Sequence, residues 1–91
     1  MGNVLENRAV VDAVPLSGPG SGPAEGWLVC RVRVDAARGV EGYPNLLAAD
    51  LPRELEALVP TVLADQLGTA ARWQVAASLV GPGRMRVEAL G

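Results

Sequence analysis

The feature that most constrains the fold is the alternation of side-chain type in WLVCRVRVD, residues 27–35. Every even-numbered side chain from position 28 to position 34 is apolar, whereas the odd positions include Arg31, Arg33 and Asp35. A period of two is typical of a strand that buries one face and exposes the other. Residues 27–35 are therefore predicted to be such a strand.

Two further segments, RWQVAASLV (72–80) and RMRVEAL (84–90), alternate in the same way. The tripeptide GPG (81–83) between them is typical of a tight reversal. Together they predict a β-hairpin.

The segment DLPRELEALVPTVLADQLG (50–68) is predicted to be an amphipathic helix. Asp50 suits the N-cap, Pro52 is tolerated in the first turn, and Gly68 favours a C-terminal end. Pro60 lies inside this segment and predicts a kink or a break into two short helices. The apolar residues that form one stripe at helical spacing are Leu51, Leu55, Leu58, Val59, Val62, Leu63 and Leu67.

The segment RAVVDAVPL (8–16) adds a first strand, so the predicted order is strand, strand, helix, strand, strand. We expect an α+β fold, ββαββ, with one helix packed on one face of a four-stranded mixed sheet. A β-grasp arrangement would make the first and last strands central, whereas the order 1-2-3-4 makes the second and third strands central and parallel. Pro15 cannot donate a hydrogen bond to a neighbouring strand, which favours an edge position for the first strand and the order 1-2-3-4.

A Gly/Pro-rich stretch, SGPGSGPAEG, separates the first strand from the rest. Ninety-one residues fit a single domain, 1–91, in which 1–16 is an edge strand or arm, 17–26 a flexible loop and 27–91 the core. A loop of this length lets the first strand pair with its own sheet or with a second copy of the chain. It does not suit a phosphate-binding loop, because a strand follows it and the chain has no Lys.

The composition argues against most enzyme chemistry, because the chain has no His, no Lys and only one Cys. Histidine is the commonest general base and metal ligand, and Cys30 falls on the apolar side of its strand, where packing is the expected role. We therefore expect no catalytic residues, no metal and no cofactor. All eight basic residues are Arg, which is the usage expected of a bacterial GC-rich genome.

The sequence also predicts a cytoplasmic protein without a membrane segment. The N-terminal sequence MGNVLENRAVV lacks the pattern of a signal peptide, and no apolar run is long enough to span a bilayer. A single cysteine excludes an internal disulfide.

Five arginines share the predicted open face of the sheet, where only Asp35 and Glu88 offset them. The predicted helix 50–67 carries a net negative charge, so an acidic chain is expected to present one basic face. Arg and Trp are enriched at binding hot spots. The candidate binding residues are Arg31, Arg33, Arg72, Arg84, Arg86 and Trp27.

These observations favour a non-enzymatic protein-interaction or accessory module that binds a protein partner or a second copy, as in a homodimer. One alternative is a small catalytic or ligand-binding protein that acts on an apolar compound, with Tyr43 or Asp35 as the acid. Another is a structural subunit of a larger, phage-like assembly. A weak nucleic-acid binder is a further alternative, although the net charge of −2 makes nucleic acid an unlikely partner.

Overall fold

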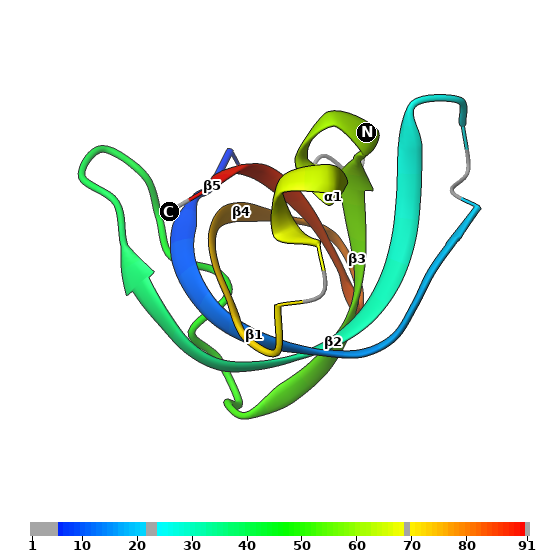
Figure 1. Cartoon of the computed structure of the whole chain (residues 1–91). Coiled ribbons are helices and arrows are strands. Elements are labelled where there is room, and N and C mark those ends of the chain that lie inside the picture. Colours follow the sequence, from blue (N-terminus) through cyan, green and yellow to red (C-terminus); the bar gives the residue numbers. More distant parts are fainter. Residues whose placement is uncertain (1–5, 22–23, 69, 91) are drawn as a thin grey trace.

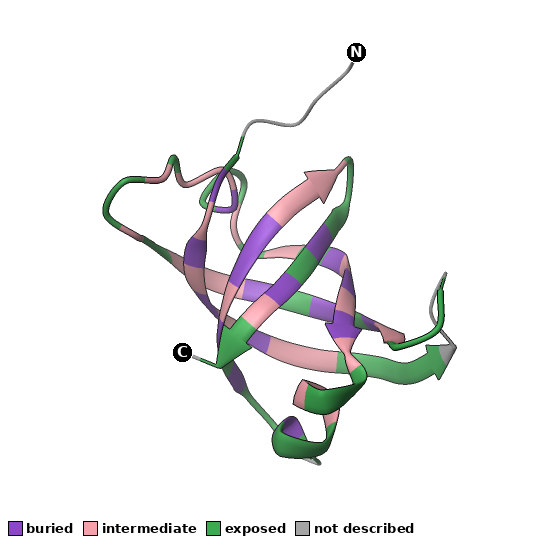
Figure 2. Ribbon diagram, turned by 90° about the horizontal axis from the view of Figure 1, so that it is seen from above, coloured by how far each residue is buried: buried purple, intermediate pink, exposed green. Residues whose placement is uncertain are grey.

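Five strands close into a barrel, with one short helix at one end (Figures 1 and 2). The computed structural model describes residues 6–21, 24–68 and 70–90. In chain order the elements are β1 (Ala9–Ser21), β2 (Trp27–Gly39), β3 (Arg53–Pro60), α1 (Thr61–Leu67), β4 (Trp73–Gly81) and β5 (Arg84–Leu90).

The strand order around the barrel is β1-β2-β3-β5-β4, and β4 pairs with β1 to close it. Every pairing is antiparallel except that of β3 with β5. The expected α+β fold with a four-stranded sheet in the order 1-2-3-4 is therefore wrong. The β4–β5 hairpin is present as predicted, but β2 and β4 are not neighbours, because β3 lies beside β2 and β1 lies beside β4.

The main cause of this difference is the segment predicted as one helix, whose first half is the strand β3. Leu55, Ala57 and Val59 point into the barrel and are at most 1% exposed. Pro60 ends the strand and stands at the N-cap position of α1, where a proline costs no helical hydrogen bond. Asp50 is not the helix cap; it lies in the connection before β3, with a φ of 57°.

The first strand is not an edge strand, because β1 pairs with β4 over Ala9–Ala13 and with β2 along its length. Pro15 lies beyond the stretch that pairs with β4, so its missing N–H leaves the β1–β4 ladder intact. Both pairings are made within one chain.

Residues 17–21, predicted as loop, continue β1 beside β2 with an irregular register. Gly18 allows this close approach: its φ is 98°, and a Cβ there would lie 2.9 Å from the carbonyl oxygen of Val29. Residues 22 and 23 of the predicted loop lie outside the described residues.

The core is mostly aliphatic, with Trp73 as its one aromatic member among the described residues, and all five strands contribute to it. Buried positions alternate with less buried ones along the strands (Figure 2). Leu47 from the β2–β3 connection and Leu67 from α1 add to it at the ends. In the part of the chain that the structure describes, no helix is long and apolar enough to cross a membrane.

Candidate functional site

The outward side chains of β2, β3 and β5 form one continuous surface, which we name the wall. Its members alternate with the buried positions of the same strands, so they line up in rows across the strands. The pairing register gives four rows: Trp27–Pro60, Val29–Leu58–Arg86, Arg31–Glu56–Arg84 and Arg33–Glu54.

The last two rows are the charged end of the wall. The Nε of Arg31 lies 3.2 Å from Oε1 of Glu54, and the Nη2 of Arg84 lies 2.6 Å from Oε1 of Glu56. These side chains remain between 36% and 56% exposed. The ion pairs are therefore open to solvent and to a partner.

Beside this end, Asp35 accepts hydrogen bonds from Arg33 at 2.7 Å and from Arg72 at 3.5 Å. The hydrogen bond from Arg33 is the main cause that lowers the pKa of the Asp35 carboxyl; burial opposes it, and the charges of Arg33 and Arg72 add to it. Arg72 thus lies next to the wall rather than in one of its rows.

The structure brings together five predicted site residues on the wall, namely Trp27, Arg31, Arg33, Arg84 and Arg86. The expected basic face is nevertheless wrong in its charge. Because the segment after position 52 is a strand, Glu54 and Glu56 point outward among the arginines, and the charged end carries both signs.

Apart from Arg86, the first two rows form the apolar end of the wall. Trp27, Val29, Leu58 and Pro60 are all half-buried, and none of them belongs to the buried core cluster. Apolar side chains gathered on an outer face mark an interaction surface more often than scattered ones do.

Sequence reasoning missed half of this apolar end, because Leu58 and Pro60 were assigned to the predicted helix. A signal was present, since RELEALVP (53–60) also alternates with a period of two. That alternation sends Glu54 and Glu56 outward, as the structure has them.

A shallow hollow adjoins the charged end at the β4–β5 turn. Its lining includes Arg31, Glu56 and Arg84 together with the turn residues from Val80 to Gly83. The N–H of Glu56 donates to the carbonyl of Gly83 at 2.9 Å, which holds the turn against β3. The guanidinium of Arg31 uses one of its five N–H donors on a carboxylate and that of Arg84 uses two, so donors remain for a ligand.

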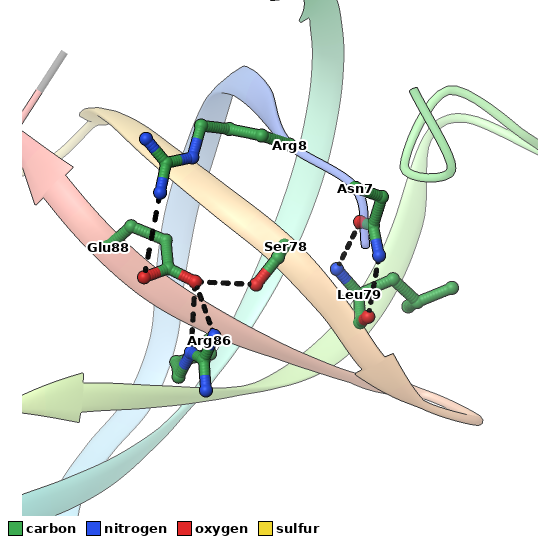
Figure 3. A network of polar contacts seen from close by, with 6 residues as sticks. All are labelled: Asn7, Arg8, Ser78, Leu79, Arg86 and Glu88. Atoms are coloured by element: carbon green, nitrogen blue, oxygen red, sulfur yellow. Dashed lines mark hydrogen bonds and ion pairs between the residues drawn. The ribbon is translucent and has the colours of Figure 1, made fainter. Parts of the chain in front are cut away.

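A second polar cluster, which we name the clasp, fixes the start of β1 to β4 and β5 (Figure 3). The pairing of β1 with β4 begins at Ala9. Just before it, the buried side chain of Asn7 forms the hydrogen bonds to β4 that a strand backbone would form. Its Nδ2 donates to the Leu79 carbonyl at 3.0 Å, and the Leu79 N–H donates to its Oδ1 at 2.7 Å.

The other half of the clasp is the carboxylate of Glu88, whose side chain is 20% exposed. It accepts hydrogen bonds from Ser78 at 2.8 Å and from Arg86 at 2.9 Å, and Arg8 lies 4.0 Å away. Burial raises the pKa of Glu88, but the hydrogen bonds from Ser78 and Arg86 and the charges of Arg86 and Arg8 outweigh burial, so its pKa lies below the usual value. The clasp comprises Asn7, Arg8, Ser78, Arg86 and Glu88, and Arg86 belongs to the wall as well.

The remaining candidates for chemistry make contacts within the chain. Cys30 is a buried free thiol in the core, and burial raises its pKa, which opposes nucleophilic use. The guanidinium of Arg8 lies 5.2 Å from the ring centroid of Tyr43, a cation–π contact. Among the described residues, no three His, Cys, Asp or Glu side chains gather as metal ligands.

Comparison of the chain with protein-family models, with curated proteins and with solved structures finds no match. The functional argument therefore depends on the chemistry of the wall and the clasp.

Proposed function

We propose that this protein is a non-enzymatic interaction module that binds a protein partner on the wall. The observation that carries the proposal is the pair of apolar rows, Trp27–Pro60 and Val29–Leu58, on an outer face beside arginines. Burial of the apolar end would supply affinity, and the charged end would select and orient the partner. Trp and Arg are the residue types that most often dominate such interfaces.

A structural role in a larger assembly would use the same surface, with neighbouring subunits as the partners. A small enzyme that acts on an apolar compound has less support, because the barrel interior is filled by the core side chains and the hollow at Arg84 lies outside it. The expected cytoplasmic location remains part of this proposal.

Nucleic-acid binding is a second candidate, favoured by one observation about the fold. Five-stranded Greek-key barrels of the OB-fold type bind oligonucleotides on the face of their second and third strands and at the loops after the first and fourth strands. The wall includes β2 and β3, the hollow lies at the loop after the fourth strand, and Trp27 offers one ring for base stacking. This is an analogy of fold alone, and the net charge of −2 together with the carboxylates of Glu54 and Glu56 favours a protein partner.

The test compares two variants that each replace an apolar side chain by aspartate. Leu58→Asp places a charge in the apolar end of the wall, whereas Val62→Asp places one on the exposed side of α1. A partner that co-purifies from the native source is identified, produced separately and titrated against both variants after circular dichroism has confirmed their folding. We expect binding to be lost in Leu58→Asp and kept in Val62→Asp.

Equal binding by the two variants would place the partner elsewhere and overturn the proposal. In a parallel titration, an oligothymidylate that binds the wild type but not Trp27→Ala would favour the nucleic-acid candidate. The salt dependence of that binding measures how many phosphates are neutralised.

A further inference from the structure

Building on the proposed function, we propose that the partner presents one extended peptide segment to the wall, with an apolar side chain on the Val29–Leu58 row and an acidic side chain on the Arg31–Glu56–Arg84 row. The acidic side chain lies two residues from the apolar one and enters the hollow between Arg31 and Arg84.

The length of the wall matches an extended segment. Rows two residues apart are about 7 Å from each other and neighbouring strands about 4.8 Å apart, so the wall measures about 20 Å by about 10 Å. One extended segment of about six residues covers the same length.

The row spacing then fixes the pattern of the segment. Side chains on one side of an extended chain recur every two residues, which is also the spacing of the wall's rows. A segment that places an apolar side chain against Val29 and Leu58 therefore brings the side chain two positions along to Arg31 and Arg84.

The charge of the wall selects a carboxylate for that second position. Arg31 and Arg84 both line the hollow and both keep unused N–H donors. Glu56 lies in the same row, so a group with two negative charges, such as a phosphate monoester, is repelled more than a single carboxylate. A carboxylate is also a good acceptor for charge-assisted hydrogen bonds from guanidinium groups.

The test uses a phage-displayed library of random peptides long enough to cover the wall, selected on the full chain and counter-selected on Leu58→Asp. We expect enriched peptides to carry an apolar residue two positions from Asp or Glu. For one such peptide, binding should weaken by about tenfold or more in Arg31→Gln and in Arg84→Gln, and by a similar factor when its acidic residue is replaced by the amide. Arg38→Gln, an exposed change near the far end of β2, is the matched control and should leave binding unchanged.

Each other outcome overturns the inference in a recognisable way. Enriched peptides that need Leu58 but lack an acidic residue, or that bind both arginine variants equally well, would leave protein docking intact and remove the acidic position. If no peptide is enriched over the counter-selection, the inference that the partner presents a peptide segment is wrong. The titration of the purified partner then still decides the proposed function. Oligothymidylate that displaces the bound peptide at a lower concentration than the free peptide does would favour nucleic acid over both a peptide segment and a protein partner.

Discussion

The wall and the clasp are built from the same chemistry, arginine against carboxylate, but in different surroundings. On the wall, Arg31 and Glu54 are 56% and 55% exposed and meet through one contact of 3.2 Å. In the clasp, Glu88 is 20% exposed and is shared by Ser78 and two arginines.

The difference shows what each cluster is suited to do. Exposed ion pairs contribute little to folding stability because water and salt screen them, which leaves the wall free to exchange its pairs for a partner. A half-buried carboxylate with several donors contributes more, and its loss leaves those donors unpaired. We therefore expect the clasp to hold the barrel closed and the wall to bind.

The largest expected effect concerns Asn7, whose buried side chain fixes the start of β1 to β4. Asn7→Ala removes both hydrogen bonds to Leu79 and leaves a backbone N–H and C=O unpaired, which should lower the free energy of unfolding by about 2 to 4 kcal/mol. Urea unfolding measures this, with the exposed Gln74→Ala on the neighbouring strand as control. A loss no greater than that of the control would mean that the clasp does not hold β1.

A smaller effect is expected at the carboxylate of the clasp. Glu88→Gln keeps the shape but weakens the hydrogen bonds from Ser78 and Arg86, and it should lower the free energy of unfolding by about 1 to 2 kcal/mol at neutral pH. The same change on the wall, Glu54→Gln, should cost less than about 0.5 kcal/mol. An equal loss of unfolding free energy at the two positions would show that the wall and the clasp contribute equally to stability.

Acid should remove the contribution of Glu88 selectively. Its pKa is lowered in the folded protein, so its contribution is complete above the unfolded value of about 4.3 and is lost as the pH falls through the folded value. Unfolding curves from neutral pH to about pH 2.5 should therefore show the wild type approaching Glu88→Gln in stability at the acid end. A gap between the two proteins that stays constant over this range would contradict the lowered pKa.

The smallest expected effect is the coupling between Arg31 and Glu54. A double-mutant cycle with Arg31→Gln and Glu54→Gln should give about 0.5 kcal/mol or less, and about 1 M salt should abolish it. The cycle for Arg86 and Glu88 should give a larger value that survives salt. A larger coupling energy for Arg31 and Glu54 than for Arg86 and Glu88 would show that solvent exposure does not explain the difference between the wall and the clasp.

Much of the strand content could be predicted from local pattern. The alternation in 27–35 correctly placed Cys30, Val32 and Val34 in the core and the arginines between them outside. The prediction failed at 53–60 because Leu55 and Val59, four residues apart, fit a helical stripe and one face of a strand equally well. The residues between them distinguish the two structures. A strand turns Ala57 inward, whereas a helix would turn Leu58 inward, and the structure buries Ala57 and turns Leu58 outward.

The candidate site could be predicted only in the strands that were themselves predicted correctly. The arginines and Trp27 could be assigned to one face because each lies on a strand with clear alternation. Their partners Glu54 and Glu56, and the apolar side chains of Leu58 and Pro60, could not be assigned while β3 was taken for a helix.

The sequence by itself determined which side chains of β2, β4 and β5 lie on the same face, because a period of two is a local property of an extended chain. Apart from the β4–β5 hairpin, which the sequence predicts, the tertiary structure alone decided which strands are neighbours. Residues from Arg53 to Pro60 become a strand because β2 and β5 on either side pair with their backbone and the barrel interior takes Leu55, Ala57 and Val59. This non-local pairing closes the barrel. It also places side chains of β3 among the arginines, so the face that was predicted to be basic is a wall with an apolar end and a charged end.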